Sequence, residues 1–158
     1  MAQPNTKPYI QAATICERVL HEPDGVFSAI RMIDILTLKT ALLARPPGLP
    51  PDAVAVNAVQ VFSLTLLIML KSGAVTGDHR LAIAMRDPSN NATRMGSELP
   101  AVLKDQTGVN YVLGFGLPFN APAGQYWFDV LWDDEVLTSI PLKVQQEGVQ
   151  GTTEPQAP

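Results

Sequence analysis

QYWFDVLW (residues 125–132), DDE (133–135) and VLTSIPLKV (136–144) make up the stretch that decides the fold of this chain. Apolar and polar positions alternate through both long segments, so that one face of each is apolar. A repeat of two residues is the spacing of a β-strand that lies on a core. The predicted inward residues are Tyr126, Phe128, Val130, Trp132, Val136, Thr138, Ile140, Leu142 and Val144. The stretch therefore predicts a terminal β-hairpin with an acidic turn.

Alternating segments elsewhere predict further short strands. Pro23-Asp24-Gly25 forms a turn between the first two of them, because proline presets φ and glycine accepts a positive φ. The alternation slips at Ile33-Asp34-Ile35, which indicates a β-bulge or a crossing between sheets. The segments are residues 9–20, 26–38, 60–71, 79–86, 99–103 and 109–117. About seven or eight short strands separated by turns predict an all-β, immunoglobulin-like Greek-key β-sandwich.

One local motif supports this fold class. Gly124-Gln125-Tyr126 precedes the penultimate predicted strand. A tyrosine at that place in immunoglobulin-like domains donates a hydrogen bond to the backbone a few residues upstream. We expect Tyr126 to form such a tyrosine corner.

The 158 residues are enough for one domain with a two-layer core. Residues 1–8 are expected to form a flexible N-terminal arm, and residues 9–144 a single β-sandwich domain. Residues 145–158 consist mainly of Gln, Gly, Thr and Pro, so a disordered C-terminal tail is expected there.

Composition argues against several classes of partner. The net charge is −4, and the 11 Lys and Arg residues are scattered, so no nucleic-acid footprint is expected. The apolar stretch at residues 53–70 is interrupted by polar residues and is better explained by a buried strand than by a membrane span. A single cysteine, together with an N-terminus unlike a signal peptide, favours a cytoplasmic protein.

Two alternatives to a protein-interaction module stay open, one enzymatic and one dependent on calcium. A hydrolase would use His79 as a general base with Asp78 and another loop carboxylate. A calcium-dependent binder would use oxygen ligands from the loops. The candidate ligands are Asp78, Asp87, Asp133, Asp134 and Glu135. Cys16 and His21 differ by an odd number of positions, which places them on opposite faces of one strand and argues against a nucleophile–base pair. No cofactor is expected.

The chain also resembles a family of uncharacterised bacterial proteins that are small stand-alone immunoglobulin-like β-sandwiches. The resemblance rests on turn and core segments spread over residues 9–144. These are Ile15–Leu20, Pro23-Asp24-Gly25, Phe27–Asp34, Phe62–Leu64 to Lys71–Gly73, Gly124–Val130 and Ile140–Leu142. The resemblance implies the sandwich fold and no assigned activity, so no catalytic residue follows from it.

The expected function is a non-enzymatic protein-interaction or assembly module that binds a protein partner or forms a homo-oligomer. Several large apolar residues lie on the predicted strand faces that point away from the core, and such patches mark interfaces. The candidate interface residues are Trp127, Leu131, Leu137, Leu67 and Met69.

Overall fold

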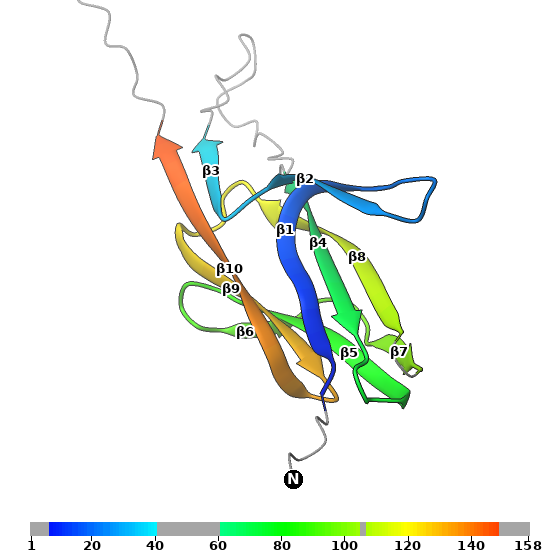
Figure 1. Cartoon of the computed structure of the whole chain (residues 1–158). Coiled ribbons are helices and arrows are strands. Elements are labelled where there is room, and N and C mark those ends of the chain that lie inside the picture. The colour runs from blue at the N-terminus through cyan, green and yellow to red at the C-terminus, as the bar shows by residue number, and fades with distance from the viewer. Residues whose placement is uncertain (1–6, 41–60, 105–106, 149–158) are drawn as a thin grey trace, which may run out of the picture.

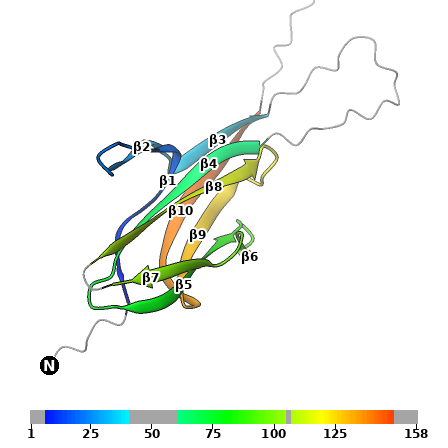
Figure 2. The same ribbon diagram turned by 90° about the vertical axis from the view of Figure 1, so that its right-hand side faces the viewer.

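The computed structural model describes residues 7–40, 61–104 and 107–148, and these form an all-β structure of two facing sheets (Figures 1 and 2). The four-stranded sheet has the order β2-β1-β4-β8. The six-stranded sheet has the order β3-β10-β9-β5-β6, and β7 also pairs with β5. The strands are β1 (Tyr9–His21), β2 (Phe27–Met32), β3 (Ile35–Thr40), β4 (Val61–Lys71), β5 (Gly77–Arg86), β6 (Ala92–Arg94), β7 (Leu99–Leu103), β8 (Gly108–Pro118), β9 (Gly124–Trp132) and β10 (Glu135–Gly148). The predicted two-sheet β-sandwich is confirmed.

The core lies between the two sheets and is built from alternate residues of their central strands. From β9 it receives Tyr126, Phe128, Val130 and Trp132, and from β4 it receives Leu64, Leu66, Ile68 and Leu70. The Phe128 and Phe115 rings meet across the sandwich with centroids 4.9 Å apart. The alternation predicted for β9 and for β4 is therefore confirmed.

The slip at Ile33-Asp34-Ile35 is a crossing between sheets. The chain leaves the four-stranded sheet after Met32 and enters the other sheet at Ile35, where β3 pairs in parallel with β10. Two backbone bonds of 2.8 Å fix the crossing, one from Ile33 N–H to the Ile15 carbonyl and one from Lys143 N–H to the Asp34 carbonyl. Segment 26–38 thus forms parts of two strands rather than one. Phe27–Met32 belongs to the four-stranded sheet, and Ile35–Thr40 belongs to the sheet that faces it.

The expected hydrogen bond of the tyrosine corner is present. The Tyr126 hydroxyl donates to the Pro122 carbonyl at 3.0 Å, and its ring is buried. Gly124 begins the strand with a φ of 146°, and a Cβ on it would lie 2.6 Å from the Pro88 Cβ. Only glycine fits there, so the chain enters β9 at a fixed angle and Tyr126 points into the core.

Two details of the predicted β10 are wrong. A register shift between Val136 and Thr138 adds one residue to the strand, so Val136 is 54% exposed while Leu137 packs against the core. A β-bulge reverses the inward and outward parity on one side of it, and this one occurs directly after the turn. The strand also continues to Gly148, past the expected boundary at residue 144. Residues 1–6 and 149–158, to which the expected arm and tail extend, lie outside the described residues.

Within the part of the chain that the structure describes, no helix is long and apolar enough to cross a membrane. Residues 61–70 of the apolar stretch belong to β4, one of the two inner strands of the smaller sheet.

Candidate functional site

The outer face of the six-stranded sheet carries an ion pair between a buried carboxylate and a half-buried arginine. Asp129 projects from β9 to this face, where it is 6% exposed. Arg86, at the end of β5, donates from Nε to Asp129 Oδ2 at 2.6 Å and from Nη2 to Oδ1 at 2.8 Å. The Ser139 hydroxyl on β10 donates to Oδ1 at 2.5 Å. The bond from Arg86 lowers the pKa of the Asp129 carboxyl despite its burial. The pair is therefore ionised and fixed in a two-bond geometry at neutral pH.

Trp127 lies beside this ion pair on the same face. It is half-buried, with Arg86 opposite it on β5 and Pro141 opposite it on β10. The Arg86 Cζ atom lies 5.7 Å from the centroid of the indole ring, within cation–π range. Asp129 holds the guanidinium, and the guanidinium in turn restricts the indole. The result is an aromatic side chain in a defined orientation on an outer sheet face.

The structure does not bring the five predicted interface residues together. Trp127 and Leu131 share the outer face of the six-stranded sheet, where both are half-buried. Leu137 packs against the core. Met69 and Leu67 lie on β4 in the other sheet; Met69 is half-buried and Leu67 is 4% exposed. Trp127 and Leu131 are thus the two that form part of one surface.

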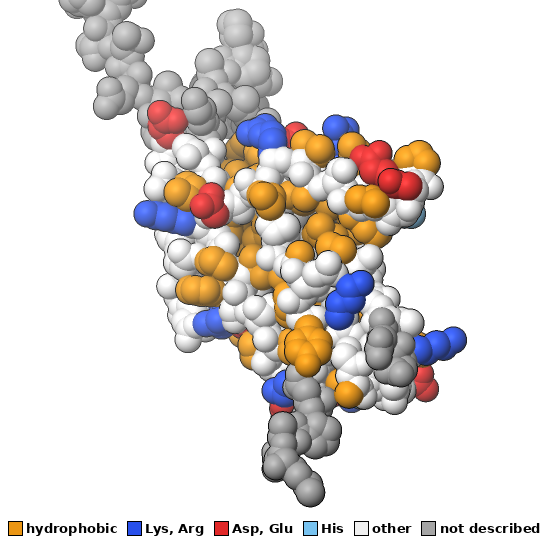
Figure 3. All heavy atoms as spheres, in the orientation of Figure 1, with side chains coloured by type: hydrophobic (Ala, Val, Ile, Leu, Met, Phe, Trp, Pro, Cys, Tyr) orange, Lys and Arg blue, Asp and Glu red, His pale blue; other side chains and the backbone are white. Residues whose placement is uncertain are grey.

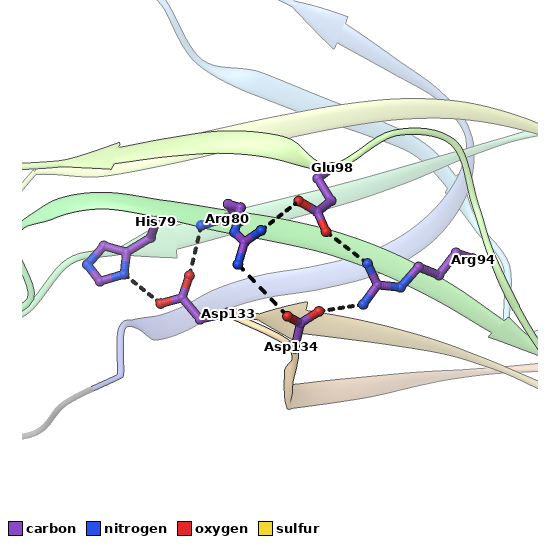
Figure 4. Close-up of polar contacts among 6 residues, drawn as sticks. All are labelled: His79, Arg80, Arg94, Glu98, Asp133 and Asp134. Atoms are coloured by element: carbon purple, nitrogen blue, oxygen red, sulfur yellow. Dashed lines mark hydrogen bonds and ion pairs between the residues drawn. The ribbon is translucent and has the colours of Figure 1, made fainter.

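The acidic turn between β9 and β10 is part of a charged network with β5 (Figure 4). Asp133 and Asp134 have φ values of 47° and 68°, which make a tight hairpin turn whose twist matches its strands. Asp133 accepts from the Arg80 backbone N–H at 3.0 Å, and its other oxygen lies 2.7 Å from His79 Nδ1. Asp134 contacts Arg80 at 4.0 Å and also pairs with Arg94. The turn is therefore attached to the neighbouring strands by its own carboxylates.

Glu98 completes this network from the segment before β7. It accepts from Arg94 at 2.9 Å and from Arg80 at 3.3 Å, so each arginine bridges two carboxylates. These side chains are exposed, and individual surface pairs contribute little to stability. Their main consequence is that the acidic turn is locally neutralised.

His79 is held by the sheet at both ring nitrogens. Nδ1 contacts Asp133, Nε2 lies 3.3 Å from the Thr76 carbonyl, and the ring stacks on Trp132 with centroids 4.7 Å apart. The hydrogen bond with Asp133 raises the pKa of His79. Asp78, its predicted companion in a hydrolase, adds only a weaker Coulombic contribution in the same direction. In this geometry His79 fastens the β9–β10 turn to β5.

The His79–Asp133 contact predicts a loss of stability at alkaline pH. A histidine whose folded pKa is raised contributes its full stabilisation below the unfolded value, about 6.5, and loses it as the pH rises through the folded value. Urea unfolding of the wild type at pH 5.5 and at pH 8.5 should therefore show lower stability at the higher pH. His79→Gln should reduce this difference, because it removes the imidazole that pairs with Asp133. Equal profiles for the wild type and His79→Gln would contradict the assignment.

The predicted calcium ligands do not converge. The described residues contain no group of three or more His, Cys, Asp or Glu side chains that could hold a metal ion. Asp133 and Asp134 face His79 and arginines, as described above. Asp87 accepts from the Ser89 backbone at 2.9 Å and from the Asn91 backbone at 2.8 Å, which closes the β5–β6 turn. Each of these carboxylates has a structural partner in place of a shared ion.

Cys16 and His21 are also separate. Cys16 is fully buried, and its thiol lies 3.6 Å from the Thr65 carbonyl. Burial raises the pKa of the Cys16 thiol, which disfavours the reactive thiolate. His21 instead stacks on Phe27 in the β1–β2 hairpin, with ring centroids 4.8 Å apart. The expected separation of the two residues is confirmed.

An apolar groove, missed in the sequence, opens between β8 and the β6–β7 segment. Its volume is about 510 Å³, and its lining combines core residues with the inward side of β8. The principal lining side chains are Leu66, Ile83, Met95, Leu99, Leu113 and Phe115. A signal for it was present in β8, since residues 108–118 contain no charged residue.

A smaller hollow of about 370 Å³ lies on the opposite side of the sandwich, between β1 and β10. Met32 at its rim is 71% exposed. Figure 3 shows hydrophobic side chains in the middle of the face that it draws, with most charged side chains toward the edge of that face. The sandwich therefore exposes apolar surface along both of its open sides.

Comparison with known proteins gives a match to a family model and distant likenesses to solved structures. A family model described as "Family of unknown function (DUF6941)" matches residues 55–145, more than half of the chain. No curated protein matches the sequence. The structure is similar to that of Pseudomonas fluorescens alkylpurine DNA glycosylase AlkC bound to DNA containing an abasic site analog, with 11% identity and a TM-score of 0.43. That likeness covers 84% of this chain and 30% of the glycosylase chain.

Proposed function

We propose that this chain, which belongs to the family of unknown function DUF6941, is a non-enzymatic protein-interaction or assembly module of a bacterial cell. Its place of action in this proposal is the cytoplasm. The sandwich is of the immunoglobulin-like type, a proposal supported by the Tyr126 corner at the start of the penultimate strand. The surface that contacts the partner is the outer face of the six-stranded sheet around Trp127.

The observation that carries this proposal is the pairing of Trp127 with an arginine that is itself held rigid. Trp and Arg are enriched among the residues that dominate binding energy at protein interfaces. Arg86 is held by two bonds to Asp129, so the indole and the guanidinium are already ordered before a partner arrives. Ordering side chains in advance reduces the entropy cost of binding.

The surroundings of Trp127 suit a flat protein contact. Ala82 and Ala84 on β5 are small and buried, and Leu131 adds an apolar side chain on the same face. The charged network of Arg80, Arg94, Glu98 and Asp134 lies near one end. Asp129 lies between Trp127 and Leu131 on β9, so this face combines apolar side chains with a fixed ion pair and a charged border.

Replacing Trp127 by serine is expected to weaken partner binding at least tenfold, because an interface anchor contributes about 2 kcal/mol or more. The partner would first be captured from the native host with the wild-type chain and identified. Binding of the purified partner would then be measured by titration calorimetry with the wild type and with Trp127→Ser.

Tyr9→Ser provides the matched control. Tyr9 is also an exposed aromatic residue, but it lies at the start of β1, in the other sheet. We expect Tyr9→Ser to bind like the wild type. If both variants bind with wild-type affinity, or if the wild type captures no protein, the proposal is wrong.

A further inference from the structure

The strand β8 is an open edge of the four-stranded sheet. It extends over 11 residues, Gly108–Pro118, and among the described strands it pairs only with β4. An edge strand leaves the backbone N–H and C=O groups of alternate residues without partners, and these groups can accept another strand. In Figure 2 the open side of β8 faces the viewer, above β7.

The other outer strands have features that oppose strand addition. Strand β2 contains Arg31 at a φ of 51°, which breaks its regular extension. Strand β6 is three residues long and contains Arg94, and β7 contains Pro100. Strand β3 is six residues long, about half the length of β8. Charges, prolines and short length are the usual protections of a sheet edge, and β8 lacks all of them over residues 108–117.

The inward side of β8 borders the apolar groove. Leu113 and Phe115 form one wall, and Met95 and Leu99 form the other. A strand added beside β8 would direct every second side chain toward this groove. The edge thus offers backbone hydrogen bonds together with space for apolar side chains, which is the combination that strand addition requires.

The β8 sequence is complementary to itself in the antiparallel direction. A twofold axis at Leu113 would place Val112 opposite Gly114 and Tyr111 opposite Phe115 of the second copy. Val109 would face Leu117 in the same way. Directly opposite residues share a face of the sheet, so inward residues meet inward residues in this register. On the outer face Val112 meets a glycine, and no pair brings like charges together.

From this edge and its register we propose that two copies of this chain pair antiparallel through β8 and form one continuous sheet across a twofold axis. Such an axis uses the same surface on both copies and closes the assembly at two. A charged peptide would find no opposite charge on β8, whereas a second β8 matches it in length and polarity. The Trp127 face lies in the other sheet, so this dimer leaves the proposed partner surface free.

Sedimentation velocity at concentrations from about 1 to 100 µM tests the pairing. The wild type should change from a 17.0 kDa monomer to a dimer of twice that mass as concentration rises. Val112→Lys places a charge in the pairing edge at a position that is already 43% exposed, and it should raise the dissociation constant at least tenfold. Val136→Lys is the same change at an exposed site of the other sheet and should leave the dimer intact.

A charge pair tests the register. A Cβ on Gly114 would have no atom within 4 Å, so Gly114→Glu is accommodated in the monomer. In the proposed register, the Val112→Lys and Gly114→Glu variants should each dimerise poorly alone and associate when mixed, because the two new charges would face each other. A monomeric wild type at 100 µM, an unaffected Val112→Lys or a mixture that stays monomeric would overturn the proposal. A dimer that is lost in Trp127→Ser but kept in Val112→Lys would also overturn the β8 pairing. That result would still be compatible with the Trp127 face as a contact surface.

Discussion

Replacing Phe128 by alanine is expected to lower the free energy of unfolding by about 3–5 kcal/mol. Phe128 is fully buried at the centre of β9, and its ring meets Phe115 across the sandwich. Alanine would leave a cavity that two hydrogen-bonded sheets cannot close by a small movement. Urea denaturation at neutral pH, followed by circular dichroism, measures the loss.

Phe27→Ala is the control for this prediction. Phe27 is half-buried in the β1–β2 hairpin and stacks on His21, so its removal leaves no enclosed cavity. We expect its effect to be about 1 kcal/mol. Similar losses for the two variants would mean that Phe128 is not the centre of the core.

Removing the Asp129 carboxylate is expected to cost about 2–3 kcal/mol, the second largest effect. Asp129→Ala would leave the bonds from Arg86 and Ser139 without an acceptor at a site that is 6% exposed. Removing one partner of a fully buried ion pair is strongly destabilising, but Arg86 is 31% exposed and keeps a bond of 3.4 Å to Asn90 Oδ1, so the expected loss is smaller. Asp134→Ala removes a carboxylate from exposed pairs and should cost about 0.5 kcal/mol.

The same carboxylate predicts a specific response to acid. The folded pKa of Asp129 is lowered by Arg86, so its stabilisation is complete above the unfolded value, about 3.9, and is lost as the pH falls through the folded value. Between about pH 4 and pH 2 the wild type should lose more stability than Asp129→Asn, which has no carboxylate to protonate. Parallel pH profiles would contradict a role for this ion pair in the folded state.

The strands and the core could be read from the sequence because each strand shows its own alternation. Phe128 and Leu66 were assigned inward from a repeat of two residues, a property of the local chain. The slip at Ile33-Asp34-Ile35 was visible for the same reason, but it left a β-bulge and a crossing between sheets as alternatives, and the pairing of β3 with β10 decides for the crossing. Tyr126 was found from its position before a predicted strand.

Features that depend on pairing between distant segments could not be read in this way. Arg86 and Asp129 are 43 residues apart, and only the pairing of β5 with β9 brings them together. The bulge that turns Leu137 inward follows from the register of β10 against β9. The burial of Leu67 on an outward face likewise depends on its neighbours across the sheet.

The groove and the open edge show the same limit. The uncharged sequence of β8 was visible, but its position at the end of a sheet follows from the strand order β2-β1-β4-β8. A strand with this composition would be unremarkable inside a sheet. Its place at the end of the sheet order leads to the proposed pairing, and the sequence pattern alone does not contain that place.

Site-specific photo-cross-linking beside Trp127 in the native host tests the central claim most directly. Gln125 is exposed and lies two residues before Trp127, on the same face of β9. Gln125 would be replaced by p-benzoylphenylalanine with Trp127 kept, and Tyr9 would receive the same probe as a control. The proposed function predicts a discrete cross-linked adduct of a second protein from position 125 that is absent from position 9. No adduct from position 125, or the same adduct from both positions, would contradict an interaction module that binds through this face.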